Sequence, residues 1–336
     1  MVGGSPDAPL LVVDDLKKYY PVRGGIWGAK IGDVRAVDGV SFTVARGETL
    51  GLVGESGCGK STLGRTMIRL EDPSDGQVYF EGKDLARATR DELFRLRRDI
   101  QIIFQDPYSS LNPRMTVGEI VREPLVVHRT GTRAEQLEKV RSLMETVGLT
   151  GEMLDRYPHE FSGGQRQRIG VARALALDPK LVIADEPVSA LDVSVQSQVL
   201  NLMVRLQQER GLTYVFISHD LSVVEHVSDT VAIMYLGRIV ERGPVDRIFG
   251  RPAHPYTRAL LEAIPAANPL GRRIRVPVEG ETPSPVSPPP GCAFHPRCPF
   301  AVDECRADVP VLDPVDDDGG HPAHIHLAAC IRKHEI

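Results

Sequence analysis

The residues best suited to chemistry lie in one short stretch, Gly54–Ser61, which reads GESGCGKS. It fits the pattern G-x-x-x-x-G-K-[ST], in which backbone N–H groups meet phosphate oxygens because glycines remove obstructing side chains. Lys60 would direct a positive charge at the outer phosphates, and Ser61 would offer a hydroxyl to Mg²⁺. An ordinary glycine-rich turn is the alternative, so the flanking elements must decide between the two interpretations.

The flanking sequence fits a phosphate-binding loop. Residues 49–53 (TLGLV) form a short apolar run between two glycines, as in a buried strand, and residues 61–70 contain no helix breaker except Gly64. We therefore expect the order strand, loop, helix. In that order the positive end of the helix dipole points at the phosphates.

Two adjacent carboxylates follow a second buried strand. Residues 181–184 (LVIA) are continuously apolar, as in the middle of a parallel sheet, and Asp185 and Glu186 come directly after them. Ligands bind at the carboxyl ends of such strands. We expect Asp185 to hold Mg²⁺ through water and Glu186 to orient and polarise an attacking water. The apolar strand disfavours the alternative, a surface acidic turn.

Two further polar residues end buried strands in the same way. Gln105 follows the run 100–104. At the end of a buried strand its neutral side chain could reach a metal or an attacking water. His219 comes after the run 213–217. We expect His219 to contact a γ-phosphate, with a purely structural histidine as the alternative. The first strand ends at Tyr19 and Tyr20; Tyr20 is the better candidate to stack on an adenine ring, and half-buried strand aromatics are the alternative.

The sequence Ser162-Gly163-Gly164-Gln165 opens a helix with one apolar face. Ser162 can cap this helix, and the two glycines leave its first N–H groups bare for an anion. A simple N-cap would explain the serine but not two adjacent glycines.

Composition and charge narrow the class of protein. The 336 residues are 42% hydrophobic and 25% charged, with a net charge of −5, which describes a globular protein and disfavours a general nucleic-acid binder. No apolar run approaches the length of a membrane span, and the N-terminal sequence lacks the pattern of a secretory signal. We expect a cytoplasmic location, with membrane contact made through partner proteins.

The chain changes character along its length. Helical periodicity indicates an insertion over about residues 106–160, and from about residue 250 the composition becomes rich in proline. Residues 251–265 contain one amphipathic helix, and residues 279–290 read as an extended proline-rich linker.

Four of the five cysteines lie at the end of the chain, spaced C-x5-C-x6-C-x24-C, at Cys292, Cys298, Cys305 and Cys330. Thiolate ligation of a [4Fe–4S] cluster, a zinc site and free or oxidised thiols are the three interpretations. Zinc sites usually use closely paired cysteines, which this spacing lacks. A histidine in place of one ligand stays open for His295, His321, His324 and His326.

Together these motifs resemble those of a known family. GESGCGKST, FQDP, FSGGQRQRIGVARAL, LVIADEP, SALD and SHD stand in the order of the ABC-transporter ATPase subunit over residues 10–250, and HPYTRALLEAIP with GCAFHPRCP resembles the C-terminal extension of the dipeptide/oligopeptide and nickel importer branch. Within that branch the chain looks most like the F-type of two paired ATPase subunits.

The resemblance assigns roles to single residues. It implies that Glu186, His219 and Gln105 are catalytic, and that Ser61, Gln105 and Asp185 hold Mg²⁺. It implies ATP binding by Tyr20, Gly54, Glu55, Ser56, Gly57, Cys58, Gly59, Lys60, Ser61, Thr62, Ser162, Gly163, Gly164, Gln165 and Asp192, although Cys58 reads as packing.

The resemblance also implies an α/β fold: a P-loop NTPase domain over 1–250, with a mixed sheet, an antiparallel β subdomain and a helical subdomain at about 106–177, then a small cysteine-containing extension over 251–336. It implies two ATPase domains closing head to tail around ATP, here a heterodimer with a paralogue on the cytoplasmic face of the membrane. Two transmembrane permeases and, indirectly, an extracytoplasmic peptide-binding protein complete the importer. Transport of nickel or another small solute and a soluble non-transport ABC ATPase are the alternatives.

Overall fold

The computed structural model describes residues 8–24, 29–106, 108–264, 280–316 and 325–335. The chain forms two compact units. The first unit comprises Met1–Ala45, Thr49–Arg87 and Ser218–Ile336, and the second comprises Arg46–Glu48 and Ala88–Ile217. Each unit is described separately below. His321 and His324, which the sequence singled out, lie outside the described residues.

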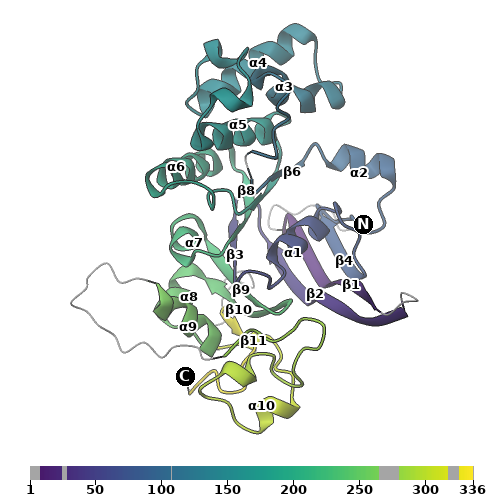
Figure 1. The fold of residues 1–336 in the computed structure, drawn as a ribbon, viewed down its shortest axis with the longest axis vertical. Coiled ribbons are helices and arrows are strands. Elements are labelled where there is room, and N and C mark those ends of the chain that lie inside the picture. The colour runs from purple at the N-terminus through teal and green to yellow at the C-terminus, as the bar shows by residue number, and fades with distance from the viewer. Residues whose placement is uncertain (1–7, 25–28, 107, 265–279, 317–324, 336) are drawn as a thin grey trace, which may run out of the picture. The chain divides into compact units, whose positions relative to one another are not determined.

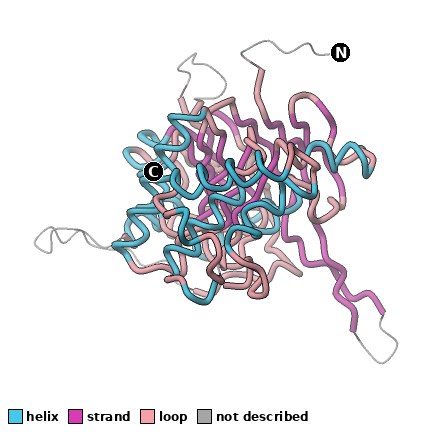
Figure 2. The backbone as a smooth tube through the Cα atoms, turned by 90° about the horizontal axis from the view of Figure 1, so that it is seen from above, coloured by secondary structure: helices cyan, strands magenta, loops and turns pink. Residues whose placement is uncertain are grey.

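The first unit contains a four-stranded antiparallel sheet of order β2-β1-β4-β5. Its long hairpin pairs the first strand with the second from Leu11↔Val44 to Gly24↔Ala29, and its two arms are the long magenta strands at the lower right of Figure 2. The strand that the sequence predicts to end at Tyr20 continues to Gly24. The strands are β1 (Leu11–Gly24), β2 (Ala29–Val44), β4 (Asp75–Phe80) and β5 (Lys83–Asp84).

A second set of strands in the first unit carries the loop Gly54–Ser61. β3 (Thr49–Val53) runs parallel to β9 (Thr230–Tyr235), and β10 (Arg238–Pro244) is antiparallel to β9. β3 and β9 are buried throughout, as their apolar runs predict. The helices of this part are α1 (Lys60–Met67), α7 (Leu221–Val227) and α8 (Val245–Gly250).

The second unit combines three parallel strands with helices. The strand order is β8-β7-β6, from β6 (Ile100–Ile103), β7 (Leu181–Asp185) and β8 (Thr213–Ser218). Figure 1 shows α3, α4 and α5 grouped together, and they pack through their buried apolar faces. The helices are α2 (Arg90–Leu96), α3 (Val117–Val127), α4 (Arg133–Thr146), η1 (Gly151–Met153), η2 (Pro158–Glu160), α5 (Gly163–Leu175) and α6 (Val193–Arg210).

Capping boxes made by a threonine and a glutamate start three of these helices. Thr89, Thr116 and Thr132 each accept a hydrogen bond from the backbone N–H of the glutamate three residues later. The side chain of that glutamate accepts a hydrogen bond from the backbone N–H of the threonine. Such reciprocal pairs satisfy two N–H groups that a helix N-terminus otherwise leaves without partners. The sequence predicted α3 and α4 but not α2, although Thr89 and Glu92 carried the same signal.

The C-terminal extension is built into the first unit. Its predicted amphipathic helix is confirmed as α9 (Pro255–Ala263), and β12 (Leu327–Ala328) pairs with β10 at Glu241↔Ala328. The proline-rich stretch, described from residue 280, also packs on the unit, because Pro285 O accepts a hydrogen bond from Arg35 N at 3.1 Å. The remaining elements are η3 (His295–Arg297), α10 (Glu304–Ala307) and β11 (Asp313–Pro314).

A buried glutamate ties this extension to β10. Glu241 is fully buried and accepts hydrogen bonds from Ala253 N at 2.7 Å and His254 N at 3.0 Å, while its Oε1 lies 2.7 Å from His326 Nε2. His254 Nδ1 accepts from Tyr256 N at 3.1 Å and so caps α9. The cap requires an unprotonated Nδ1, and burial lowers the pKa of His254 to about 4 although Glu241 opposes the shift.

This cap predicts a pH-dependent stability. The unfolded chain binds a proton at His254 below about pH 6.5 and the folded chain only below about 4, so the free energy of unfolding falls as pH drops through that window. The full loss is about 3 kcal/mol by linkage. Urea unfolding of His254→Asn, which can still cap α9, should show a shallower decline than the wild type between pH 6.5 and 4. Parallel profiles would contradict this role of His254.

Candidate functional site

The loop between β3 and α1 is shaped by close backbone approaches. Gly59 has φ +107°, and a Cβ there would lie 1.9 Å from Ala36 O of β2. Gly57 has φ +80° with no atom within 4 Å of such a Cβ. The N-cap residue of α1 is Gly59, which contributes no side-chain cap, so the helix N-terminus is presented through its backbone. This is the strand, loop and helix order that the sequence predicted.

Lys60 is held inside this loop. Its side chain is only 4% exposed, and Nζ donates to Gly54 O at 2.7 Å and Glu55 O at 2.9 Å. Cys58 is also buried, with Sγ 3.8 Å from Nζ, and burial raises the pKa of its thiol. A buried, protonated thiol packs the loop and does not act as a nucleophile.

Of the two tyrosines of β1, Tyr20 is the more accessible. Its ring is 36% exposed, its hydroxyl donates to Glu71, and the Lys18 ammonium lies 5.0 Å from the ring centroid. The Tyr19 hydroxyl is instead engaged by the carboxylate of Asp38. Tyr20 is therefore the more open of the two tyrosines, and its stacking on adenine stays a prediction, with half-buried strand aromatics as the alternative.

His219 is exposed and belongs to the first unit. It directly precedes Asp220, whose carboxylate accepts from Ser222 N at 2.9 Å and caps α7. His219 therefore lies one residue before the N-cap of α7, and its contact with a γ-phosphate stays a prediction.

In the second unit, Gln105 and Glu186 come together. Asp185 ends β7 at 1% exposure, and Gln105 Nε2 donates to Glu186 Oε2 at 2.9 Å. Glu186 has φ +45°, a left-handed backbone that is uncommon for a residue with a side chain, and its N–H donates to Ile217 O at 3.0 Å. Strained backbone of this kind collects at functional sites. The Glu186 carboxylate therefore lies directly after β7 and is held by the side chain of Gln105.

The start of α5 follows the predicted N-cap. Ser162 Oγ accepts from Gln165 N at 3.4 Å, and Gln165 Oε1 accepts from Ser162 N at 3.0 Å. Gly164 has a packing reason, because a Cβ there would lie 2.2 Å from Val195 Cγ1 of α6. Asp192, exposed, is the N-cap residue of α6 without a side-chain cap. Packing therefore explains Gly164, and a Cβ at Gly163 would in turn lie 3.3 Å from Leu191 Cδ2.

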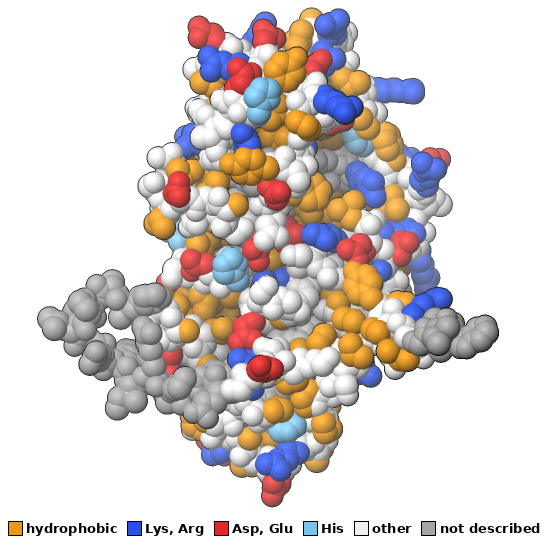
Figure 3. Space-filling view, in the orientation of Figure 1, with side chains coloured by type: hydrophobic (Ala, Val, Ile, Leu, Met, Phe, Trp, Pro, Cys, Tyr) orange, Lys and Arg blue, Asp and Glu red, His pale blue; other side chains and the backbone are white. Residues whose placement is uncertain are grey.

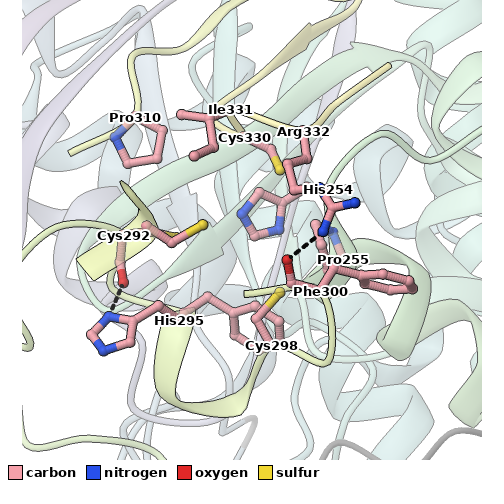
Figure 4. Close-up of a pocket in the computed structure, with 12 residues that line it drawn as sticks. His254, Pro255, Cys292, His295, Cys298, Phe300, Pro310, Cys330, Ile331 and Arg332 are labelled. Carbon is pink, nitrogen blue, oxygen red and sulfur yellow. Dashed lines mark hydrogen bonds between the residues drawn. The ribbon is translucent and has the colours of Figure 1, made fainter. Parts of the chain in front are cut away.

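The four C-terminal cysteines line one pocket of the first unit, shown in Figure 4. All are free thiols, and burial raises the pKa values of Cys292 and Cys298 and that of Cys330 to about 11. Among the described residues, however, no group of three or more His, Cys, Asp or Glu side chains stands in a metal-holding arrangement. The donor set suits a metal, whereas its arrangement does not, so the predicted [4Fe–4S] cluster is not supported here.

Comparison with known proteins places these sites in a family. Residues 37–189 match the ABC transporter family, and residues 240–305 match the C-terminal region of oligopeptide/dipeptide transporters. A "Dipeptide transport ATP-binding protein DppF" of Escherichia coli is 56% identical over 322 residues, covering 96% of this chain and 94% of the relative. The chain belongs to the ATP-binding proteins of ABC transporters. It is an ABC ATPase, as the motifs predicted.

Other relatives agree with this assignment. A "Probable peptide ABC transporter ATP-binding protein" of Sinorhizobium fredii is 56% identical over 95% of this chain and 91% of the relative, and an "Oligopeptide transport ATP-binding protein AppF" of Bacillus subtilis is 55% identical over 96% of both. The dimeric ATP-binding cassette MJ0796 bound to ADP and Pi matches in structure with a TM-score of 0.62 at 28% identity, covering 70% of this chain and 98% of that one. The predicted α/β fold of an ABC ATPase is confirmed.

This ABC ATPase contains, within the described residues, no helix long and apolar enough to cross a membrane.

Proposed function

We propose that this ATPase powers the import of di- and oligopeptides across the cytoplasmic membrane. The observation that carries the proposal is the second family match, over residues 240–305, to the C-terminal region of oligopeptide/dipeptide transporters. The names of the most similar relatives support it, because dipeptide or oligopeptide transport appears in them at 55–56% identity. The chain would act from the cytoplasmic face as a peripheral subunit.

The partners follow from this role. Two transmembrane permeases, a second ATPase that is a paralogue of this chain, and an extracytoplasmic peptide-binding protein acting indirectly would complete the importer. The helical part of the second unit, including α3 and α4, would receive the permeases and transmit ATP-driven closure to them. Acidic and basic side chains intermingle on the face shown in Figure 3, and the net charge of −5 disfavours nucleic acid as a partner.

We propose catalytic roles for single residues. Glu186, oriented by Gln105, would position and polarise the attacking water, and Lys60 and His219 would stabilise charge on the γ-phosphate. Tyr20 would stack on adenine, and backbone N–H groups of the loop Gly54–Ser61 would bind the phosphates.

Mg²⁺ suits the donors of this chain. The Ser61 hydroxyl, the Asp185 carboxylate and the amide oxygen of Gln105, whose amide nitrogen donates to Glu186, are the hard oxygen ligands that Mg²⁺ prefers. When bound, the ion neutralises phosphate charge.

The start of α5 would act on ATP bound to the partner ATPase. Ser162, Gly163, Gly164 and Gln165 form an open helix N-terminus that suits an anion, and Asp192 would lie in the same interface. By analogy with arginine fingers, a group supplied in trans contributes about 10³- to 10⁵-fold to the rate of phosphoryl transfer. The isolated subunit should therefore hydrolyse ATP slowly.

Reconstitution tests the transport assignment. The full chain is placed in liposomes with the permeases, second ATPase and binding protein of its own gene neighbourhood, and ATP hydrolysis is measured with di- to pentapeptides or with Ni²⁺. Peptide-stimulated hydrolysis with peptide uptake is expected. Stimulation by Ni²⁺ alone would show that nickel, and not a peptide, is the transported solute. Hydrolysis unaffected by either solute, in a chain that co-purifies with ribosomes, would indicate a non-transport ABC ATPase.

We also propose that the four C-terminal cysteines bind a [4Fe–4S] cluster, with zinc as the alternative. The support is that all four line one pocket and that cysteine thiolates are the usual ligands of such clusters, although the arrangement of the four in the structure would have to change to hold one. Elemental analysis of anaerobically purified full-length chain should find iron with acid-labile sulfide. Zinc without sulfide would select the alternative, and neither metal would leave four free thiols.

A further inference from the structure

The C-terminal extension contacts the phosphate-binding loop at Glu55. Arg297 donates from Nη1 to Glu55 Oε2 and from Nη2 to Glu55 Oε1, both at 3.0 Å. Thr282 Oγ1 donates to the same carboxylate at 2.9 Å. All of these residues belong to the first unit. Glu55 and Arg297 lie 242 positions apart in sequence, so no local pattern predicted the contact.

The same extension also holds the backbone of this residue. The Tyr256 hydroxyl of α9 accepts a hydrogen bond from Glu55 N at 2.9 Å. Tyr256 is fully buried and packs against Tyr235 and Phe294, with ring centroids 4.7 Å and 5.4 Å away. Glu55 is therefore fixed through both its side chain and its amide by residues that follow the cassette.

Arg297 is well suited to hold a carboxylate. Its side chain is 9% exposed, against 29% for Glu55, so the pair is largely shielded from water. Two parallel N–H···O contacts form the bidentate arrangement that fixes both partners in orientation as well as in distance. The Arg297 guanidinium also donates to the Tyr235 hydroxyl at 3.5 Å, and arginine side chains do not lose their proton in proteins. Arg297 therefore stays charged.

The contacts of Arg297 and Thr282 with the Glu55 carboxylate, called the clamp below, offset a charge. Glu55 is an acidic residue in a loop that binds a polyanion, one position after Gly54, whose carbonyl accepts from Lys60 Nζ at 2.7 Å. Left unpaired, the Glu55 carboxylate would repel phosphate and compete for the Lys60 ammonium. Paired with Arg297, it is neutralised and held toward the extension.

We propose that Arg297, aided by Thr282 and Tyr256, is a positioning residue for ATP binding. Arg297 holds the Glu55 carboxylate away from the phosphates. The extension is then a part of the nucleotide site. This inference rests on ATP binding alone and is independent of the transported solute, so failure of peptide import would not touch it.

The test is a rescue experiment on the full-length chain. Arg297→Ala exposes the Glu55 carboxylate, and its Kd for ATP should rise about three- to tenfold, an effect of the size expected for one unshielded charge. The effect should be smaller for ADP, which carries less charge, and should shrink at high salt. In the assembled ATPase, KM for ATP should rise while kcat stays within about twofold.

The double variant Arg297→Ala with Glu55→Gln decides between charge and architecture. It lacks the clamp but also lacks the carboxylate, so its Kd for ATP should return most of the way to the wild-type value. A merely structural role for Arg297 would leave the double variant as weak as Arg297→Ala or weaker, and that outcome would overturn the proposal. Arg297→Lys, which keeps the charge without the fork, should fall between the wild type and Arg297→Ala.

Two controls complete the design. Arg258→Ala removes an exposed ion pair with Glu262 on α9 of the same extension and should leave the Kd for ATP unchanged. Thermal unfolding of every variant shows whether the fold persists. If Arg297→Ala fails to fold, Arg297→Lys and Thr282→Val serve as the test instead, each measured with and without Glu55→Gln. If Glu55→Gln restores ATP binding in neither of them, the proposal is refuted.

Discussion

Replacing Glu186 with glutamine should lower kcat of the assembled ATPase about 100- to 10,000-fold, the range expected when a positioned general base is removed. The substituted amide oxygen can still accept from Gln105 Nε2, which now donates to Glu186 at 2.9 Å, so the local geometry should persist. ATP should therefore bind with near-normal affinity and remain uncleaved. Single-turnover hydrolysis and retention of labelled ATP measure the two effects separately.

A matched variant isolates the carboxylate. Glu209→Gln removes an exposed glutamate of α6 in the same unit, where its partner is Arg205 at 4.0 Å, and should leave turnover unchanged. Wild-type turnover by Glu186→Gln would show that another group positions the water, and the left-handed backbone of Glu186 would then need a different explanation. Loss of ATP binding would point to a structural role for the carboxylate.

The sequence predicted the parts of the fold in which composition and spacing act locally. The apolar runs at Thr49–Val53 and Leu181–Asp185 are buried strands, because five consecutive residues without a charged side chain until the end suit the centre of a sheet. The N-cap at Ser162 was predicted for the same reason, since its partner Gln165 is three residues away. Local signals of this kind need no tertiary information.

The sequence did not predict the contacts between distant segments. Nothing in the spacing links Glu55 to Arg297, and the proline-rich stretch read as a free linker, whereas Pro285 and Thr282 make hydrogen bonds to the first unit. The two adjacent glycines after Ser162 looked like an anion site, yet Gly164 is also required by Val195 of α6. These features depend on which surfaces meet, which periodicity does not encode.

The phosphate-binding loop offers the second large effect. Gly59→Ala should weaken ATP binding by the full-length chain about 100-fold or more, equivalent to about 3 kcal/mol. A Cβ at Gly59 would stand 1.9 Å from Ala36 O and 3.0 Å from Met234 Cε, at a φ of +107° that an alanine rarely adopts. Because one obstacle is a backbone carbonyl of β2, the loop must move instead, and with it the N-terminus of α1 and Lys60.

Gly57 provides a control for this substitution within the same loop. Its φ of +80° also disfavours a side chain, but a Cβ there meets no atom within 4 Å. Gly57→Ala therefore carries only the backbone strain, about 1–2 kcal/mol, and should weaken ATP binding about five- to thirtyfold. Titration calorimetry with ATP measures both, and thermal unfolding checks that each variant folds. Equal losses would mean that backbone strain alone shapes the loop, whereas a larger loss at Gly59 would show that its contact with β2 holds the α1 N-terminus in place for the phosphates.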